Sequence, residues 1–537
     1  MKVSFSVVAL CVAALASAQT DVLTQHNDKM RTGAVLTETQ LTPTNVQPGS
    51  FGLINQLPVD GQVYSQPLVV SNVRRGFSLA SPLQDLVIVC TENDSVYCFD
   101  GKTLSKKPVW MVHLGNPVPS EDVGSDDMNP TIGIVSTPVI DRASHTLWVV
   151  AKTKDVQRIV PHYAIRLHAL DLYTGHEMPN SPVEISGTVA GSADDGANGI
   201  VRFNPLRQMN RPGLLLDNGI LYIAFASHGD VDPYHGWIFA YDVQRMKQVG
   251  AYCTTPDGDE TYYLPSGAGG IWQAGQGLAC DDNHNIYCMS GNGAFSHDGS
   301  GRQTGNSFIK LHLDPDGLHL VDFFTPHDSD SMNGSDKDLG SSGVLLIPGT
   351  NTMIGSGKTH EIFVVSRDRL GGYSDSTDNC LQRLQILSHG TLTGPVYFDS
   401  ATSGPTVYEG VVSDNIRAFH VNGGLLESTP FMMTTNSSVG LGSMMSISAN
   451  GQNDAILWAV QPESFNWGLA ILRAFDANDL THELWNSDMN GGDTVGTMAK
   501  FCPPTIANGK VYVPTFDGLV NVYGLLSHPR PLPHPGK

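Results

Sequence analysis

A chain of 537 residues with 52 Asp and Glu against 31 Lys and Arg carries a formal net charge of -21, which argues against nucleic acid or another polyanion as a partner. The length is enough for several domains, although one large closed β-fold can also account for it. The acidic excess can serve solubility or supply carboxylates for a hard cation, and composition does not decide between the two.

The chain begins with a short apolar segment. Lys2 is followed by an apolar run from Phe5 to Leu15 and by small residues at 16–18, which predicts a signal peptide over residues 1–18 and a secreted protein. The run is much shorter than the roughly 20 apolar residues that span a membrane, and no later stretch qualifies. We therefore expect no membrane span, and we assign residues 19–50 to an N-terminal extension.

Residues 51–526 contain one pattern eight times: an alternating strand, an Asp, a turn and a second strand. The aspartates of the clearest copies are Asp100, Asp171, Asp242 and Asp314, at intervals of 71, 71 and 72 residues. Weaker copies follow, from "EIFVVSRDRLGGY" to "GLVNVYGLL". A strand pair precedes each copy and helical periodicity is scarce, so the sequence predicts an all-β chain.

Four-stranded units that repeat eight times and need neighbours to bury their faces predict an eight-bladed β-propeller. The alternative is an open solenoid. The last unit lacks a final strand, and the segment from Phe51 to Asp60 can supply it, which would close the ring and remove its exposed edges. Residues 527–537 follow as a proline-rich tail.

Two cysteine pairs flank hairpin turns at the same spacing. They are Cys90 with Cys98 and Cys280 with Cys288. In an exported protein this equal spacing suggests two cross-strand disulfides, while the alternative is that each cysteine is a small buried strand residue. The sequence leaves both open, and it assigns no pairing to the remaining Cys253, Cys380 and Cys502.

The Asp-turn-Trp pattern of the repeats resembles that of a known family. It is clearest as Asp100 with Trp110, as "HALDLYTG", and as Asp476 with Trp485. This pattern is similar to the tryptophan-docking repeats of the pyrroloquinoline-quinone (PQQ) dehydrogenases, which are eight-bladed propellers. The family's tryptophan packs between blades and performs no chemistry. Non-enzymatic PQQ-like propellers share the same repeat, so the resemblance implies a fold and leaves the activity open.

A second, local resemblance concerns "GGIWQAGQGLACDDNHNIYCMSGNGAF", residues 269–295. It looks like the quinoprotein segment in which an entry strand with a tryptophan and an exit strand with Gly-Asn-Gly flank one hairpin. The resemblance implies that Trp272 is the stacking floor beneath the flat quinone and that Asn292 is a calcium ligand. The alternatives are an ordinary inter-blade aromatic at Trp272 and a turn residue at Asn292.

Further segments extend this resemblance to a basic and an acidic residue. "GSGKTHEIFVVSRDRLGGY" is similar to a family strand whose basic residue contacts the quinone, which implies Lys358 as a cofactor-binding residue. "TPHDSDSMNG" is similar to a segment that ends in the catalytic aspartate, which implies Asp330, with Asp328 as the second choice. A surface lysine and a solvated acidic loop are the alternatives.

The segment "SHGDVDPYHGWIFAYD" aligns with the strand that follows the family's calcium-binding glutamate. Val231 occupies the glutamate position, so the resemblance implies Asp230 or Asp232 as the oxygen ligand, and His235 lies where the family commonly has arginine. By residue type, His228, Asp230 and His235 could instead form a transition-metal site or a structural hydrogen-bond cluster.

Two functions remain open. The first is an exported quinoprotein-type oxidoreductase that oxidises an alcohol or a sugar with PQQ and Ca²⁺, in which Asp330 removes the hydroxyl proton. The sequence contains no haem-attachment motif, so its electrons would leave through a separate acceptor. The second is a non-catalytic PQQ-like propeller that binds protein or glycan. The family order of the candidate residues favours the first function, whereas the incomplete calcium set and the absence of a vicinal cysteine pair favour the second.

Overall fold

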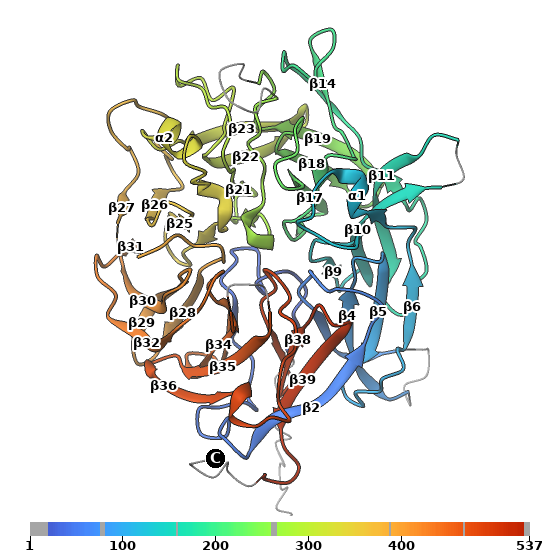
Figure 1. Ribbon diagram of the computed structural model, residues 1–537, viewed down its shortest axis with the longest axis vertical. Helices are drawn as coiled ribbons and strands as arrows, with labels where there is room; N and C mark the ends of the chain where they lie inside the picture. Colours follow the sequence, from blue (N-terminus) through green and yellow to red (C-terminus); the bar gives the residue numbers. More distant parts are fainter. Residues whose placement is uncertain are drawn as a thin grey trace, which may run out of the picture.

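The computed structural model describes residues 20–75, 81–156, 159–258, 266–385, 388–464 and 468–530. Eight antiparallel sheets are arranged around a central axis, as Figure 1 shows, and each sheet forms one blade. The prediction of an all-β, eight-bladed propeller is therefore confirmed. The predicted signal peptide at 1–18 lies outside the described residues, as do residues 531–537 of the tail.

The first four blades come from the N-terminal half of the chain. Blade 1 contains β3 (Leu68–Arg74), β4 (Leu83–Cys90), β5 (Ser95–Asp100) and β6 (Trp110–His113); blade 2 contains β9 (Val139–Asp141), β10 (Thr146–Asp155), β11 (His162–Asp171) and β12 (Val183–Glu184); blade 3 contains β15 (Gln208–Met209), β16 (Leu215–Asp217), β17 (Ile220–Ser227), β18 (Trp237–Asp242) and β19 (Lys247–Cys253); blade 4 contains β20 (Ala279–Cys280), β21 (Ile286–Met289), β22 (Phe308–Asp314) and β23 (Gly317–Phe324).

The other four blades complete the ring. Blade 5 contains β24 (Leu345–Leu346), β25 (Thr352–Ser356), β26 (Ile362–Ser366) and β27 (Gln382–Leu384); blade 6 contains β28 (Val396–Ser400), β29 (Gly404–Gly410), β30 (Asn415–Asn422), β31 (Leu425–Leu426) and β32 (Met432–Ser437); blade 7 contains β33 (Met444–Asn450), β34 (Asn453–Pro462), β35 (Ala470–Asp476) and β36 (Asp479–Asn486); blade 8 contains β37 (Thr505–Ala507), β38 (Lys510–Pro514), β39 (Leu519–Leu525) and β2 (Phe51–Pro58).

The remaining short elements lie in the N-terminal extension or in the connections between blades. They are β1 (Ala34–Val35), which pairs with β33, β7 (Val118–Pro119), β8 (Thr131–Ile132), β13 (Thr188–Ala190), β14 (Ile200–Arg202), the helices α1 (Ser120–Val123) and α2 (Ser329–Asn333), and the 3-10 turns η1 (Gln273–Gly275), η2 (Leu339–Ser341) and η3 (Ser487–Met489). None of the helices in the described part of the chain is long and apolar enough to cross a membrane.

The ring closes through the N-terminal strand. β2 pairs antiparallel with β39, from Phe51 opposite Leu525 to Pro58 opposite Leu519, and so becomes the outermost strand of blade 8. This confirms the closing strand that the unpaired last repeat predicted. Because β2 pairs with the free edge of β39, the last blade has four strands, as blades 1, 2, 4 and 5 do.

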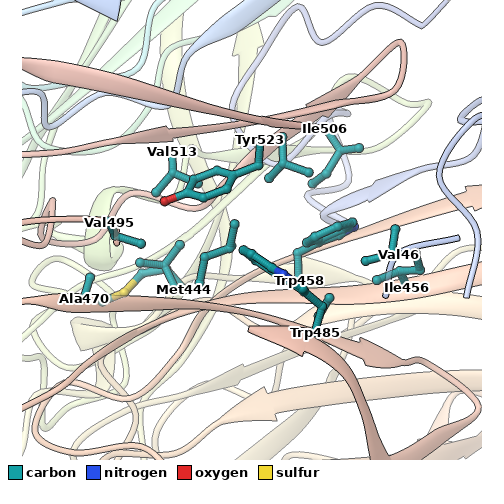
Figure 2. Close-up of a cluster of buried hydrophobic side chains, with 14 of the residues drawn as sticks. Val46, Met444, Ile456, Trp458, Ala470, Trp485, Val495, Ile506, Val513 and Tyr523 are labelled. Atoms are coloured by element: carbon teal, nitrogen blue, oxygen red, sulfur yellow. The ribbon is translucent and has the colours of Figure 1, made fainter. Parts of the chain in front are cut away.

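The hydrophobic core is divided among the interfaces between neighbouring blades. Figure 2 shows the cluster between blades 7 and 8, where Trp458 and Trp485 are fully buried. The ring of Phe51 packs edge-on against Trp485 at a centroid distance of 5.0 Å. The indole of Trp458 donates a 2.8 Å hydrogen bond to Oγ of Ser448, so its polar atom is satisfied inside the cluster. The closing strand is thus anchored by packing as well as by hydrogen bonds.

Trp110 shows how a repeat tryptophan joins two blades. Its indole N–H donates a 3.1 Å hydrogen bond to the carbonyl of Leu172 in the turn of blade 2. The ring lies against Gly175, where an added Cβ would come within 2.5 Å of it, so the glycine of "LYTG" is required by this contact. The structural role that the resemblance implied for this tryptophan is the one observed.

The N-terminal extension threads along the inner strands, and Figure 1 shows it in blue at the centre of the ring. Val22 pairs with Val69 of blade 1, and carbonyls farther along the segment accept hydrogen bonds from Ile140, Cys280, Leu346, Tyr397 and Ile447, in blades 2, 4, 5, 6 and 7. Arg31 is completely buried and donates to the carbonyl of Leu278 at 2.8 Å. This segment therefore ties most of the blades together near the axis.

The predicted disulfides are wrong, because all seven described cysteines are free. In blade 1, Cys90 lies opposite Val96 and Cys98 lies opposite Ile88, so the two cysteines are diagonal neighbours offset by two positions. Cys280 lies opposite Ile286, which gives Cys288 the same offset. Equal spacing reflects a shared hairpin register, and each pair packs into an inter-blade hydrophobic cluster.

Candidate functional site

A cavity of about 180 Å³ lies where the loops that enter several inner strands converge. Its lining includes Trp272, Lys358 and Asp230, which the sequence proposed as site residues. It also includes side chains that the sequence did not single out: Asp127, Arg211, Asp338, Lys500 and Phe501. These residues come from the connections around blades 2, 3, 4, 5 and 8, so the cavity is built by the ring as a whole.

Trp272 precedes the first strand of blade 4 and forms one wall of the cavity. Its indole N–H donates a 3.3 Å hydrogen bond to the carbonyl of Ser227, and its ring meets Tyr234 edge-on at 5.9 Å. A Cβ added to Gly270 or Gly291 would lie 2.6 or 2.8 Å from the indole. The glycines of "GGIW" and "SGNG" therefore leave room for the ring, which explains why they flank this hairpin.

Asp338 and Lys358 form an ion pair in the same cavity. Nζ of Lys358 lies 2.6 Å from Oδ2 of Asp338 and 3.0 Å from Oδ1 of Asp336. Burial would lower the pKa of Lys358, but Asp338 and Asp336 outweigh it and raise the pKa above its ordinary value. Oδ1 of Asp338 accepts a 2.7 Å hydrogen bond from the backbone N–H of Asn292, so the carboxylate is held from two sides.

Asn292 belongs to an amide network beside the cavity. Its Oδ1 accepts a 2.9 Å hydrogen bond from Nδ2 of Asn306, which also donates to Oδ1 of Asn333 at 2.8 Å. Oδ1 of Asn306 in turn accepts from the backbone N–H of Leu339 at 3.0 Å. The network fixes η2, and with it Asp338, against blade 4.

The structure does not bring Asp328 and Asp330 to the cavity. Asp330 lies on α2 with 71% of its side chain exposed, and its carboxylate is 3.6 Å from His297. Asp328 is bound by both terminal nitrogens of Arg383, at 2.9 and 2.8 Å. Burial would raise the pKa of Asp328, but Arg383 outweighs it and lowers the pKa. Helix α2 and the turn after it separate these two acids from the cavity, and Asp338 is the acid of this segment that lines it.

A positional signal could have identified Asp338. It stands seven residues before Leu345, the start of β24, just as Trp272 stands seven residues before Ala279, the start of β20. In both connections the residue at this position lines the cavity. An alignment based on the sequence of α2 alone leads to Asp330 and does not reach Asp338.

The acids and histidines that follow β17 are dispersed. Asp230 lines the cavity, its Oδ1 accepts a 2.7 Å hydrogen bond from the Tyr234 hydroxyl, and burial raises its pKa. Asp232 instead accepts from the hydroxyl of Ser266. Nε2 of His235 is 3.1 Å from Asp195. In the part of the chain that the structure describes, Asp314, Asp316 and His319 are the group of acids and histidines with metal-ligand spacing, and they lie on the exposed hairpin of blade 4.

Behind the cavity lies a buried Lys152–His228 pair. Nζ of Lys152 lies 2.9 and 3.0 Å from the carbonyls of Leu206 and Gln208 and 2.8 Å from Nε2 of His228. Burial lowers the pKa of Lys152 to about 7 and holds that of His228 well below its usual range. When Lys152 is protonated, its three N–H groups serve these three acceptors, which leaves the proton of a neutral His228 on Nδ1, 3.9 Å from Asp127.

Comparison with known proteins relates this architecture to two solved dehydrogenases. No family model and no curated protein matches the sequence. The quinohemoprotein alcohol dehydrogenase ADHIIG from Pseudomonas putida HK5 is similar over 96% of this chain and 82% of its own, with 13% identity and a TM-score of 0.56. A europium-containing methanol dehydrogenase is similar over 92% and 89% of the two chains, with 13% identity and a TM-score of 0.55. The chain therefore shares its fold with these two dehydrogenases.

Proposed function

We propose that the cavity binds a flat, anionic quinone of the PQQ type and that the protein oxidises an alcohol or a sugar there. The observation that carries the proposal is the meeting of Trp272, Lys358 and Asp338 around one cavity. An indole surface, a cation and a carboxylate base are the three kinds of group that such a reaction needs. The shared fold of the two dehydrogenases supports this choice.

The residues present fit a flat, anionic quinone. A planar ring system gains from stacking on an aromatic face, which Trp272 supplies. Three cations line the same cavity, namely Lys358, Arg211 and Lys500, although the chain as a whole is strongly acidic. Cations that converge in a partly dry site are suited to the carboxylates of such a cofactor.

The residues do not fit the calcium ion that the resemblance implied. Calcium takes six to eight oxygen ligands. The Oδ1 of Asn292 already accepts from Asn306, Asp232 is engaged by Ser266, and Asp338 is paired with Lys358. Asp230 is the one remaining candidate that lines the cavity, and burial raises its pKa, which opposes the ionised form. The proposed reaction therefore involves no calcium ion.

In this proposal the chain's own residues bind the substrate and move one proton. When bound, the quinone supplies a two-electron acceptor for the hydride of the alcohol carbon. Asp338 takes the hydroxyl proton on a carboxylate oxygen, as a general base does. Lys358 and the backbone N–H of Asn292 fix the position of that carboxylate. Trp272 holds one face of the cavity.

The proposal extends to location and partners. The sequence at 1–18 directs export, and the reduced cofactor passes its electrons to a separate acceptor. Expression of the full-length chain, with N-terminal sequencing of the product found in the medium, checks the first point. Retention of the product inside the cell would contradict it.

The test of cofactor binding is a titration of the purified protein with PQQ, followed by tryptophan fluorescence and by calorimetry. Saturable binding is expected, in the presence of EDTA as well as of Ca²⁺. Trp272→Ala should weaken binding at least tenfold, because the stacking surface is lost. Absence of binding under both conditions would contradict the proposal and favour the non-catalytic binding propeller.

A further inference from the structure

The hairpin that joins β22 and β23 gathers polar side chains on one of its two faces. Leu313 and Leu318 lie opposite each other and pack against the hydrophobic cluster between blades 3 and 4. Because side chains alternate along a strand, His312 and Asp314 lie on the other face. His312 stands directly opposite His319 in the register of the two strands. Cross-strand partners have Cβ atoms about 5 Å apart, so the two imidazoles can reach one ion.

Asp316 adds a second carboxylate from the turn of this hairpin. Asp314, Asp316 and His319 each offer one ligand atom, and these three atoms all lie within 4.8 Å of one another. Nε2 of His319 is 3.3 Å from Oδ1 of Asp316. Two ligands of a tetrahedral zinc ion with bonds of about 2.1 Å lie about 3.4 Å apart, so this pair already has the required spacing.

His312 extends the group to four side chains. Its Nε2 is 4.0 Å from Oδ1 of Asp314. Its Nδ1 is buried without a hydrogen-bond partner, so Nε2 is the nitrogen that an ion can reach from solvent. The group therefore contains two imidazoles and two carboxylates within eight consecutive residues.

The equivalent aspartates of other blades have a different task. In blades 1, 2 and 3, Oδ1 of the repeat aspartate accepts a hydrogen bond from a backbone N–H of its own turn, at 2.9, 2.9 and 3.0 Å, and these residues are Asp100, Asp171 and Asp242. In blade 4 only residues 315 and 316 lie between the paired Asp314 and Gly317. Among the described residues, none donates such a bond to Asp314, whose side chain is 52% exposed. This carboxylate is therefore available to a ligand.

The chemistry of the four groups selects the class of ion. Imidazole nitrogen suits zinc, copper and nickel, whereas calcium and magnesium prefer oxygen ligands alone. Two imidazoles and two carboxylates supply the four ligands that zinc takes in a tetrahedral site, and the carboxylates balance its charge.

We propose that the hairpin of blade 4 binds one divalent transition-metal ion, such as Zn²⁺, through four side chains: His312, Asp314, Asp316 and His319. The bound ion bridges β22 and β23 and holds the end of the hairpin closed. This site is separate from the central cavity, because none of the four side chains lines it. The inference therefore does not depend on the proposed function.

The experiment titrates the full-length protein, stripped of metal with EDTA and then dialysed, with Zn²⁺ and with Ca²⁺ by calorimetry. One Zn²⁺ should bind per chain, at least about 100-fold more tightly than Ca²⁺. His312→Gln and His319→Gln should each weaken Zn²⁺ binding at least about tenfold, because each removes one ligand. His482→Gln is the matched control, since His482 is an exposed histidine on β36, in the corresponding hairpin of blade 7, and binding should not change.

X-ray absorption at the zinc edge gives a second readout. The Zn²⁺-loaded protein should show two imidazole ligands, and His319→Gln should show one. Zn²⁺ binding no tighter than Ca²⁺ binding would overturn the inference, as would unchanged Zn²⁺ binding in both ligand variants or an equal loss in His482→Gln. His319→Gln decides the matter if His312→Gln does not fold, because His319 is the more exposed of the two, at 48% against 34%.

Discussion

The interface between blades 7 and 8 consists of apolar side chains, whereas the central cavity is lined largely by charged ones. The interface is apolar, with Trp458, Trp485 and Phe51 packed in one cluster, and the indole N–H of Trp458 is hydrogen-bonded inside it. The cavity is lined by charged side chains on loops, among them Asp338 and Arg211. The difference teaches that packing between repeats holds the ring, while the loops that enter the inner strands vary from blade to blade and form the candidate site.

The largest expected effect concerns the interface. Trp458→Ala removes a completely buried indole and leaves a void, so it should lower the free energy of unfolding by about 3–5 kcal/mol. Denaturant unfolding followed by circular dichroism measures this loss. The control is Val321→Ala, whose side chain is 52% exposed and should change stability by less than about 0.5 kcal/mol. Equal losses in the two variants would show that the interface does not hold the ring.

An intermediate effect concerns a buried acid inside the scaffold. Glu409 is fully buried, and burial raises its pKa from 4.5 to about 8. Between these values the unfolded chain ionises while the folded protein keeps the proton, so stability falls as pH rises from about 4.5 to about 8. Glu409→Gln should remove that loss and raise the free energy of unfolding at pH 9 by about 1–3 kcal/mol. Thermal melts at pH 5 and pH 9 check this, and a variant stabilised equally at both values would refute it.

A smaller effect separates the cavity from the scaffold. A Cβ at Gly291 would lie 2.6 Å from Oδ1 of Asp338 and 2.8 Å from the ring of Trp272, so Gly291→Ala should displace both groups. We expect about a tenfold loss of PQQ affinity, or about 1.4 kcal/mol, with the propeller still folded. Gly491→Ala is the control, since nothing lies within 4 Å of its added Cβ. Unchanged affinity in Gly291→Ala would mean that the ligand does not contact this wall.

The fold could be predicted from the sequence because the same pattern of strands and turns occurs in every blade. The alternating strands and the Asp-turn pattern recur along the chain, so an irregular copy does not hide the repeat. The last unit lacks one strand, which predicts that the N-terminal strand closes the ring. The equal cysteine spacing suggested disulfides, but it results from a hairpin register that two blades share. This register places the two cysteines of each pair diagonally across the strands.

The sequence predicts only part of the candidate site, because the loops that form it do not repeat from blade to blade. Lys358 stands in the short connection between β25 and β26, Trp272 stands seven residues before β20, and both line the cavity. The sequence around Asp330 resembles the family motif, which favours this residue. In the structure, however, Asp330 lies on α2 outside the cavity, and the chain reaches the cavity only at Asp338. Arg211 belongs to no motif, and only the structure shows that this buried side chain lines the cavity.

The central claim is that Asp338 is the base of an oxidation in this cavity, and the most direct measurement compares Asp338→Asn with Asp330→Asn. After loading with PQQ, each variant is assayed for alcohol- or sugar-dependent reduction of an electron-accepting dye. Asp338→Asn should lose at least about 100-fold in turnover while still binding PQQ, because it removes the base and keeps the shape of the site. Asp330→Asn should retain full turnover, since its side chain is exposed and outside the cavity. The reverse pattern, with turnover lost in Asp330→Asn and kept in Asp338→Asn, would contradict the account.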